Sequence, residues 1–167
     1  MQPGQLAESV LLREYVNTGK LMQVATQDSE NKPWLVIVWY AANPRLELIF
    51  TSNVARLHSD YIRTRPTVAG SIFTTDLEGP EYVLNGPGTV VRGVTFTGDA
   101  RECVGHELEE AYETYAIRWP QAHELFPLAK IKSEESPMRI YKIAPMQFIL
   151  FDEKNYRGEP KRVILRW

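Results

Sequence analysis

The sequence contains little cysteine, no long apolar run and no basic-plus-apolar leader. Cys103 is its only cysteine, so the chain cannot form an internal disulfide and suits a reducing compartment. Its longest apolar run, from Trp34 to Ala42, is far shorter than the ~20 residues that span a bilayer. The first residues lack the pattern of a signal peptide. We therefore expect a cytoplasmic protein that does not insert into membranes.

The charge balance also excludes one class of partner. The chain carries 19 basic and 21 acidic residues, a net charge of −2, whereas proteins that bind nucleic acid need a basic surface. Its 167 residues, 44% of them hydrophobic, suffice for one domain with a large core. We predict a single domain over residues 1–167 that binds a small molecule, with no nucleic acid and no membrane as partner.

Apolar periodicity separates helical from extended segments. The helical segments are expected over Leu6–Gly19, a short stretch that contains Arg56 and stops before Pro66, Gly105–Pro120, and residues 121–129. The extended segments are Lys20–Gln27, Trp34–Ala42, Leu46–Ser52, Thr67–Thr75, Thr89–Glu102, Met138–Asp152 and Lys161–Trp167.

The order of these segments predicts the fold class. The first three strands are joined by short turns and should form an antiparallel meander. Trp34–Ala42 is so continuously apolar that burial on both faces is expected. Gly93 and Gly98 interrupt the long strand and predict bulges or tight bends, as small barrels need. We predict a mainly β (α+β) fold: a six- to seven-stranded antiparallel split barrel with flanking helices.

The junction between the third strand and the following helix has the composition of an anion site. Thr51, Ser52 and Asn53 offer side-chain oxygens there, and Ser52 or Asn53 is the expected N-cap. The first N–H groups of the helix lack intrahelical partners, and Arg56 follows as a forked donor, so a phosphate fits. Arg63 and Arg65 would add positive charge if the helix end bends back. The alternative is simple capping, with Arg56 directed into water.

Four segments in this order resemble the pyridoxamine 5′-phosphate oxidase-like family of split barrels that bind flavin mononucleotide (FMN). LMQVATQDSENKPWLVIVWYAA resembles the family's opening hairpin, and LIFTSNVARLHSDYIRTRPTVAGSIF its strand, phosphate-binding turn and helix. VRGVTFTGDAR resembles its long strand. AYETYAIRWPQA resembles a helix of the uncharacterised YhbP-like bacterial branch. The resemblance covers roughly Lys20 to Asp152.

This resemblance implies a homodimer with FMN in clefts between the subunits. The implied cofactor contacts are Val36, Ile37, Val38, Trp39, Thr51, Ser52, Arg56, His58, Arg92 and Trp119. The backbone of the first four would lie beside the isoalloxazine ring, and Thr51, Ser52 and Arg56 would meet the phosphate, with the histidine near it. Arg92 would stabilise the anionic reduced flavin, and Trp119 would line the pocket.

The sequence departs from the family's oxidases at two positions. Their phosphate-binding lysine is replaced by Leu57, and their flavin-contacting glutamine by Gly93. Their C-terminal Trp-Ser-x-Gln-Ser signature is absent. We therefore expect an FMN-dependent oxidoreductase with another, unknown substrate. The alternatives are a non-catalytic module that binds flavin or haem, with His123 as a haem ligand by analogy, and a deazaflavin-dependent reductase.

Other catalytic chemistry has little support in the sequence. The histidines His58, His106 and His123 show no metal-ligand spacing with one another or with Cys103, so no metal site is predicted. There is no Gly-x-Ser-x-Gly motif for a serine nucleophile. We nominate no side chain as a proton-transferring catalyst, because a flavin would carry the electron chemistry itself.

Overall fold

The structure is a computed structural model that describes residues 3–75, 91–153, 155–156 and 158–165. Its elements are α1 (Pro3–Thr18), β1 (Leu21–Gln27), β2 (Pro33–Ala42), β3 (Leu48–Asn53), α2 (Leu57–Thr64), β4 (Thr67–Thr75), β5 (Val91–Glu102), α4 (Gly105–Arg118), α5 (Ala122–Leu125), α6 (Leu128–Lys132), β6 (Met138–Asp152) and β7 (Lys161–Leu165). The expected start of the long strand, Thr89 and Val90, lies outside the described residues.

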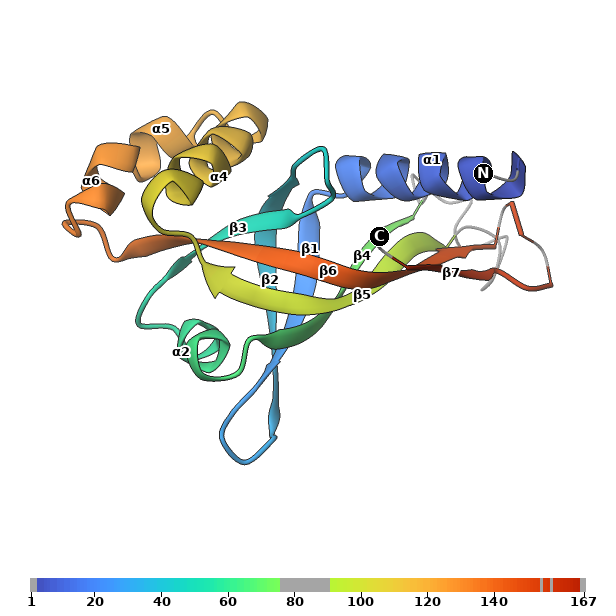
Figure 1. Cartoon of the computed structure of the whole chain (residues 1–167), viewed down its shortest axis with the longest axis horizontal. Helices are drawn as coiled ribbons and strands as arrows, with labels where there is room; N and C mark the ends of the chain where they lie inside the picture. The colour runs from blue at the N-terminus through green and yellow to red at the C-terminus, as the bar shows by residue number, and fades with distance from the viewer. Residues whose placement is uncertain (1–2, 76–90, 154, 157, 166–167) are drawn as a thin grey trace, which may run out of the picture.

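The described strands form one antiparallel sheet in the order β3-β2-β1-β4-β5-β6-β7 (Figure 1). β3 also pairs with β6 along its whole length, from Leu48 opposite Ile143 to Asn53 opposite Met138. This pairing closes six strands into a barrel and leaves β7 as an extra strand on the outside of β6. The predicted meander and the predicted antiparallel split barrel are both confirmed.

Two apolar cores follow from the alternation of side chains along the strands. The first fills the barrel and includes Met22, Val24 and Phe50. α1 and α2 add Tyr15 and Ile62 to this core from opposite ends of the barrel (Figure 1). The second core lies outside the barrel, where α4 packs its buried stripe on the outer face of β2, β3 and β6. The stripe consists of the predicted residues Leu108, Ala111, Tyr112, Tyr115 and Ala116.

A β-bulge at Gly98 shapes the long strand pair of β5 and β6. Thr97 pairs with Gln147 and Gly98 with Pro145, so Met146 is left without a partner in the register. A Cβ atom on Gly98 would lie 2.4 Å from the carbonyl oxygen of Ala144. The irregularity expected at Gly98 is therefore confirmed, and its extra residue, Met146, lies on β6. Gly93 keeps a regular register with β4 and β6, so no bulge occurs there, and a Cβ atom on it would lie 2.4 Å from the carbonyl oxygen of Ile72.

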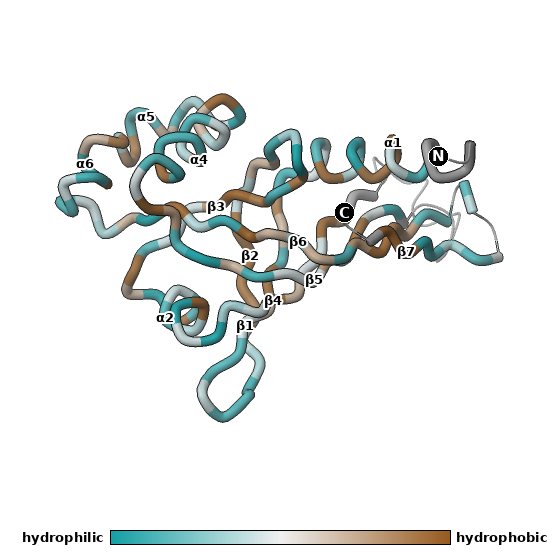
Figure 2. Tube along the Cα trace, in the orientation of Figure 1, coloured by the Kyte–Doolittle hydropathy of each residue, from teal (hydrophilic) through white to brown (hydrophobic). Residues whose placement is uncertain are grey.

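The expectation that Trp34–Ala42 is buried on both faces was wrong. Val38 and Tyr40 point into the barrel, but Leu35, Ile37 and Trp39 on the other face are 59%, 61% and 50% exposed. α4 covers this outer face only near Ala41, which belongs to the second core. Figure 2 shows the resulting apolar colouring of β2 above a hydrophilic hairpin tip. The run is apolar throughout, although one face lies open in the monomer.

No helix within the described residues is both long and apolar enough to cross a membrane.

We expect Gly98→Ala to lower the free energy of unfolding by about 1–3 kcal/mol, the usual cost of overpacking a tight site. The new methyl group would meet backbone atoms of Ala144 and Pro145, which cannot rotate away. Urea unfolding measures the change, with the exposed neighbour substitution Thr97→Ser as a control that should leave the midpoint nearly unchanged. Equal midpoints for the two variants would contradict the close approach.

Candidate functional site

The sheet splits between β2 and β3. These strands pair only over three residues each, from Tyr40 opposite Phe50 to Ala42 opposite Leu48. Beyond Phe50, β3 continues on β6, whereas β2 continues on β1 from Trp39 to Pro33. Within the described residues, this part of β2 has no strand on its second edge. Alternate residues of an antiparallel edge offer free N–H and C=O groups, so the predicted ring-binding backbone is available to a ligand.

A groove of about 390 Å³ opens at this split. Its lining residues come from β2, β3, the end of α4 and α5: Trp39, Thr51, Tyr115, Trp119, Gln121, Ala122, Leu125 and Phe126. The volume falls in the range of about 300–1,000 Å³ that small-molecule sites occupy. Four of the lining residues are aromatic and none is charged. The groove therefore suits a flat, uncharged ring.

Hydrogen bonds and ring contacts hold the walls of the groove in place. The indole Nε1 of Trp119 donates to the carbonyl oxygen of Tyr40 at 2.8 Å. The Trp39 and Trp119 rings meet edge to face, with centroids 4.8 Å apart and planes at 76°. Burial raises the pKa of Tyr115, and the neighbouring Thr51 side chain partly offsets this effect. These contacts fix two walls of the groove across the split.

Arg118 anchors the same end of α4. Its guanidinium donates to the carbonyl oxygens of Asn17, at 2.9 Å, and Gly19, where α1 ends. It also lies over the rings of Tyr40 and Trp119, at 5.0 and 5.3 Å from their centroids. Through these contacts Arg118 joins α4 to α1 and β2. Its positive charge at the C-terminus of α4 also complements the backbone dipole of that helix.

The corner between β3 and α2 differs from the expected one at the helix start. α2 begins at Leu57, and Arg56 occupies the N-cap position without a side-chain capping bond. Asn53 instead closes a turn, because its Oδ1 atom accepts from the Ala55 N–H at 2.8 Å and its carbonyl from the Arg56 N–H at 3.0 Å. The predicted N-caps, Ser52 and Asn53, were therefore wrong: one turn separates them from the helix.

Ser52 and His58 face the barrel interior at this corner, and each is only 6% exposed. Ser52 Oγ lies 2.6 Å from His58 Nε2, and Ser59 Oγ donates to the Asn53 carbonyl at 2.9 Å. Burial, assisted by the positive charge of Arg56, lowers the pKa of His58, so its imidazole is neutral at pH 7. Ser52 and His58, both predicted as cofactor contacts, thus contact each other inside the protein.

Arg56 remains exposed and has no ion-pair or hydrogen-bond partner for its side chain within the described part of the chain. The other two arginines of this region are occupied. Arg63 pairs with Asp60, and Arg65 donates to the Asn31 side chain at 2.6 Å and the Ser29 carbonyl at 2.9 Å. Both are engaged by other residues, so among the described residues Arg56 is the arginine of this corner whose side chain is available.

The structure brings together three of the predicted contacts in the groove: Trp39, Thr51 and Trp119. Ile37 shares the exposed outer face with Trp39, whereas the side chains of Val36 and Val38 face the barrel interior. Only the backbone of these two valines can therefore meet a ligand.

Arg92 does not lie in the groove. It pairs in register with Asp152 at the end of β6, whereas Thr51 pairs with Ile140 near its beginning. Its guanidinium instead lies 5.7 Å from the centroid of the Tyr15 ring on α1. Tyr15 donates a 2.5 Å hydrogen bond to Asp152, and burial together with this carboxylate raises the pKa of Tyr15 to about 12. This cluster fastens α1 to the barrel.

Sequence reasoning missed the groove residues of α5 and the segment before it. Gln121, Ala122, Leu125 and Phe126 line the site, and Tyr115 was assigned only to the buried stripe of its helix. The sequence feature that could have indicated these residues is Trp119-Pro120, which follows the end of α4 and turns the next residues back towards β2 and β3. Nothing in the periodicity of so short a helix points to a ligand.

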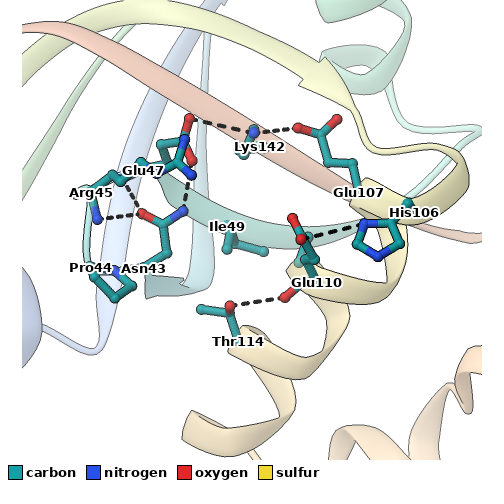
Figure 3. Close-up of a pocket in the computed structure, with 11 residues that line it drawn as sticks. Asn43, Pro44, Arg45, Glu47, Ile49, His106, Glu107, Glu110, Thr114 and Lys142 are labelled. Carbon is teal, nitrogen blue, oxygen red and sulfur yellow. Dashed lines mark hydrogen bonds and ion pairs between the residues drawn. The ribbon is translucent and has the colours of Figure 1, made fainter.

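A second, polar cavity of about 510 Å³ lies between α4 and the β2–β3 turn (Figure 3). Lys142 stands between Glu107 and Glu47, 3.4 Å from the latter, and Arg101 donates to Glu107 at 2.6 Å. Asn43 donates to Glu47 at 2.7 Å. Lys142, Glu47 and Glu107 are thus engaged with one another, and they fasten α4 to the barrel, whereas no ion pair or hydrogen bond of the Arg45 side chain is seen among the described residues.

The remaining titratable residues give no further site. Within the described residues, no three His, Cys, Asp or Glu side chains gather closely enough to hold a metal ion. Burial raises the pKa of the Cys103 thiol to about 12, which fits a packing residue rather than a nucleophile. His123 is exposed, and its Nδ1 atom lies 3.4 Å from the hydroxyl of Tyr112.

No protein-family model and no curated protein matches the sequence. Solved structures share the fold at low sequence identity. A heme binding protein from Mycobacterium smegmatis is 15% identical with a TM-score of 0.72, and the match covers 99% of this chain but only 59% of that protein. An FAD-binding protein from Mesorhizobium loti is 16% identical with a TM-score of 0.60, and the match covers 84% of this chain and 91% of that one.

A candidate pyridoxamine 5′-phosphate oxidase from Listeria innocua is also 16% identical, with a TM-score of 0.58, and the match covers 87% of this chain and 97% of that protein. The barrel is therefore that of the pyridoxamine 5′-phosphate oxidase-like split-barrel structures, as predicted. At these identities the likeness shows the fold alone, and the YhbP-like branch stays a prediction.

We expect Glu107→Gln to destabilise the protein at pH 7 and to have no effect at low pH. Burial raises the pKa of Glu107, but hydrogen bonds from Arg101 and Lys142 outweigh this effect and lower it overall. A lowered carboxyl pKa contributes stability above the unfolded value of about 4.3, and this stability is lost as pH falls through the folded value.

Thermal unfolding of both proteins between pH 3 and pH 7 measures the effect, with the exposed substitution Glu135→Gln as the control. The melting temperatures of wild type and Glu107→Gln should converge as the pH falls. A constant gap at every pH would show that the carboxylate charge does not stabilise the fold.

Proposed function

We propose that this protein is an FMN-binding flavoprotein that acts as an oxidoreductase. The observation that supports it most is the split between β2 and β3, where a free strand edge adjoins an uncharged aromatic groove. A flavin ring needs both features, since its polar edge can bond to backbone groups while its faces contact apolar side chains. When bound, FMN would supply the electron-transfer chemistry.

The residues present fit this cofactor. Trp39 and Trp119 would cover the ring and exclude water from it, and the unpaired backbone of β2 would orient its edge. Arg56 would hold the phosphate together with the N–H groups of Leu57 and His58 at the start of α2, since the next two N–H groups already donate to the Arg56 carbonyl. Thr51 joins the two regions, because it lines the groove and stands one residue before the corner begins.

We propose further that two copies associate through the outer face of β2 and β1. Leu21, Leu35, Ile37 and Trp39 are exposed there, and contiguous apolar patches on a protein surface mark interaction sites. Trp39 belongs both to this face and to the rim of the groove. A second copy would therefore close the groove from the open side, as the homodimers that the sequence resembles do.

Flavin is favoured over haem by the lining of the groove. Neither histidine nor cysteine is among its lining residues in the described part of the chain. Tyr115 offers an oxygen, but burial raises its pKa, which disfavours the tyrosinate that would bind iron. His123, the haem ligand considered by analogy, lies against Tyr112 instead.

An absorption spectrum of protein purified from cells tests this function. Flavin bands near 370 and 450 nm support it, a Soret band supports haem, and a deazaflavin has a single near-visible band.

Purified protein should then be titrated with FMN and riboflavin, and the reduction of bound FMN by NADH or NADPH should be followed. Binding without reduction favours a non-catalytic flavin module. A colourless protein that binds neither flavin would refute the proposal.

We expect Arg56→Ala to weaken FMN binding by about 1.5–3 kcal/mol, the usual worth of a hydrogen bond to a charged group. Riboflavin binding should not change, because riboflavin has no phosphate. Calorimetric titration measures both affinities, and Arg63→Ala serves as a control because Arg63 already pairs with Asp60. An equal loss for FMN and riboflavin would remove Arg56 from the phosphate site.

We expect Ile37→Arg to convert the proposed homodimer into monomers, since a charge in an apolar interface core is strongly disfavoured. Ile37 is mostly exposed in the monomer, so folding should be preserved. Sedimentation velocity measures the association state. Ile117→Arg places the same charge on an exposed apolar residue of α4 and should leave the dimer intact. A dimeric Ile37→Arg protein would place the interface elsewhere.

A further inference from the structure

Gln121 is the unusual residue among those that line the groove. Six of the others are aromatic or aliphatic, and Thr51 offers only a hydroxyl. Gln121 stands at the N-cap position of α5 without a side-chain capping bond. Gln121 is exposed, and its carboxamide has no hydrogen-bond partner among the described residues, so it is available to a ligand. A polar group of this kind in an apolar site usually fixes the orientation of a ligand.

We propose that Gln121 is a specificity-determining residue that recognises the imide edge of the bound ring. This inference rests on the proposed function. A flavin's pyrimidine ring carries an N3–H donor between two carbonyl acceptors. A carboxamide is complementary to this edge, because its oxygen accepts from N3–H while its NH₂ group donates to a neighbouring carbonyl.

The position of Gln121 supports this pairing. The residue follows Trp119-Pro120 directly, and the Trp119 ring is held by its bond to the Tyr40 carbonyl. The backbone at Gln121 is fixed as well, because its carbonyl accepts from the N–H groups of Glu124 and Leu125 at 3.1 and 3.0 Å. The carboxamide is thus presented from a fixed main chain beside an aromatic wall.

The proposed pairing also sets the range of rings that the groove would accept. The site would then select rings with an imide edge, flavins and deazaflavins alike, over flat rings without one.

Binding of FMN and of N3-methyl-FMN to wild type and to Gln121→Met tests the inference. Methionine has a similar length and flexibility but cannot form either hydrogen bond. Wild type should prefer FMN by roughly tenfold, and Gln121→Met should lose most of this preference while binding FMN roughly tenfold more weakly than wild type. Gln27→Met, at the exposed end of β1, is the matched control and should behave as wild type.

The ratio of the two affinities separates recognition from structural damage, because a merely distorted groove would weaken both ligands equally. An unchanged ratio in Gln121→Met overturns the role of Gln121 and leaves the flavin site standing. If wild type binds neither FMN nor riboflavin, the proposed function and this inference both fail.

Discussion

The divergence of β3 from β2 after Tyr40 and Phe50 is the constraint on which the candidate site depends. β3 pairs with β6 over all six of its residues, which closes the barrel, but with β2 over only three. The rest of β2 keeps a free edge, whose backbone groups water or a ligand must satisfy. The barrel is therefore closed through β3 and β6 but split between β2 and β3, and the groove forms where these two strands separate.

The helices convert this split into a bounded site. α4 docks on the outer face of β3 and β6 through an apolar stripe, and the ion pairs around Lys142 fix it there. Arg118 and Trp119 at its end contact α1 and β2. Because Pro120 ends the helix at this point, α5 turns back over the split and supplies the remaining wall.

Much of the fold could be predicted from the sequence because periodicity reports on local geometry. β4 and β6 begin and end where the pattern predicted, and the bulge at Gly98 was visible as a glycine within a strand. The exposure of Ile37 and Trp39 could not be predicted, since an apolar run does not tell whether a helix, a partner chain or nothing covers each face. The burial of Ser52 depends on strand parity, which the composition of the turn does not reveal.

The two cavities show why polarity alone is a poor guide to a binding site. The larger one is rich in charge, but Lys142 pairs with Glu47 and Glu107, and Arg101 also pairs with Glu107, so a ligand that binds these groups would have to break ion pairs before forming its own contacts. The groove at the split is smaller and uncharged, yet it adjoins a free strand edge, and Arg56 at the nearby corner has no partner within the described chain. A ligand gains most where the protein leaves its own groups unsatisfied, so the split rather than the larger cavity is where a cofactor is expected.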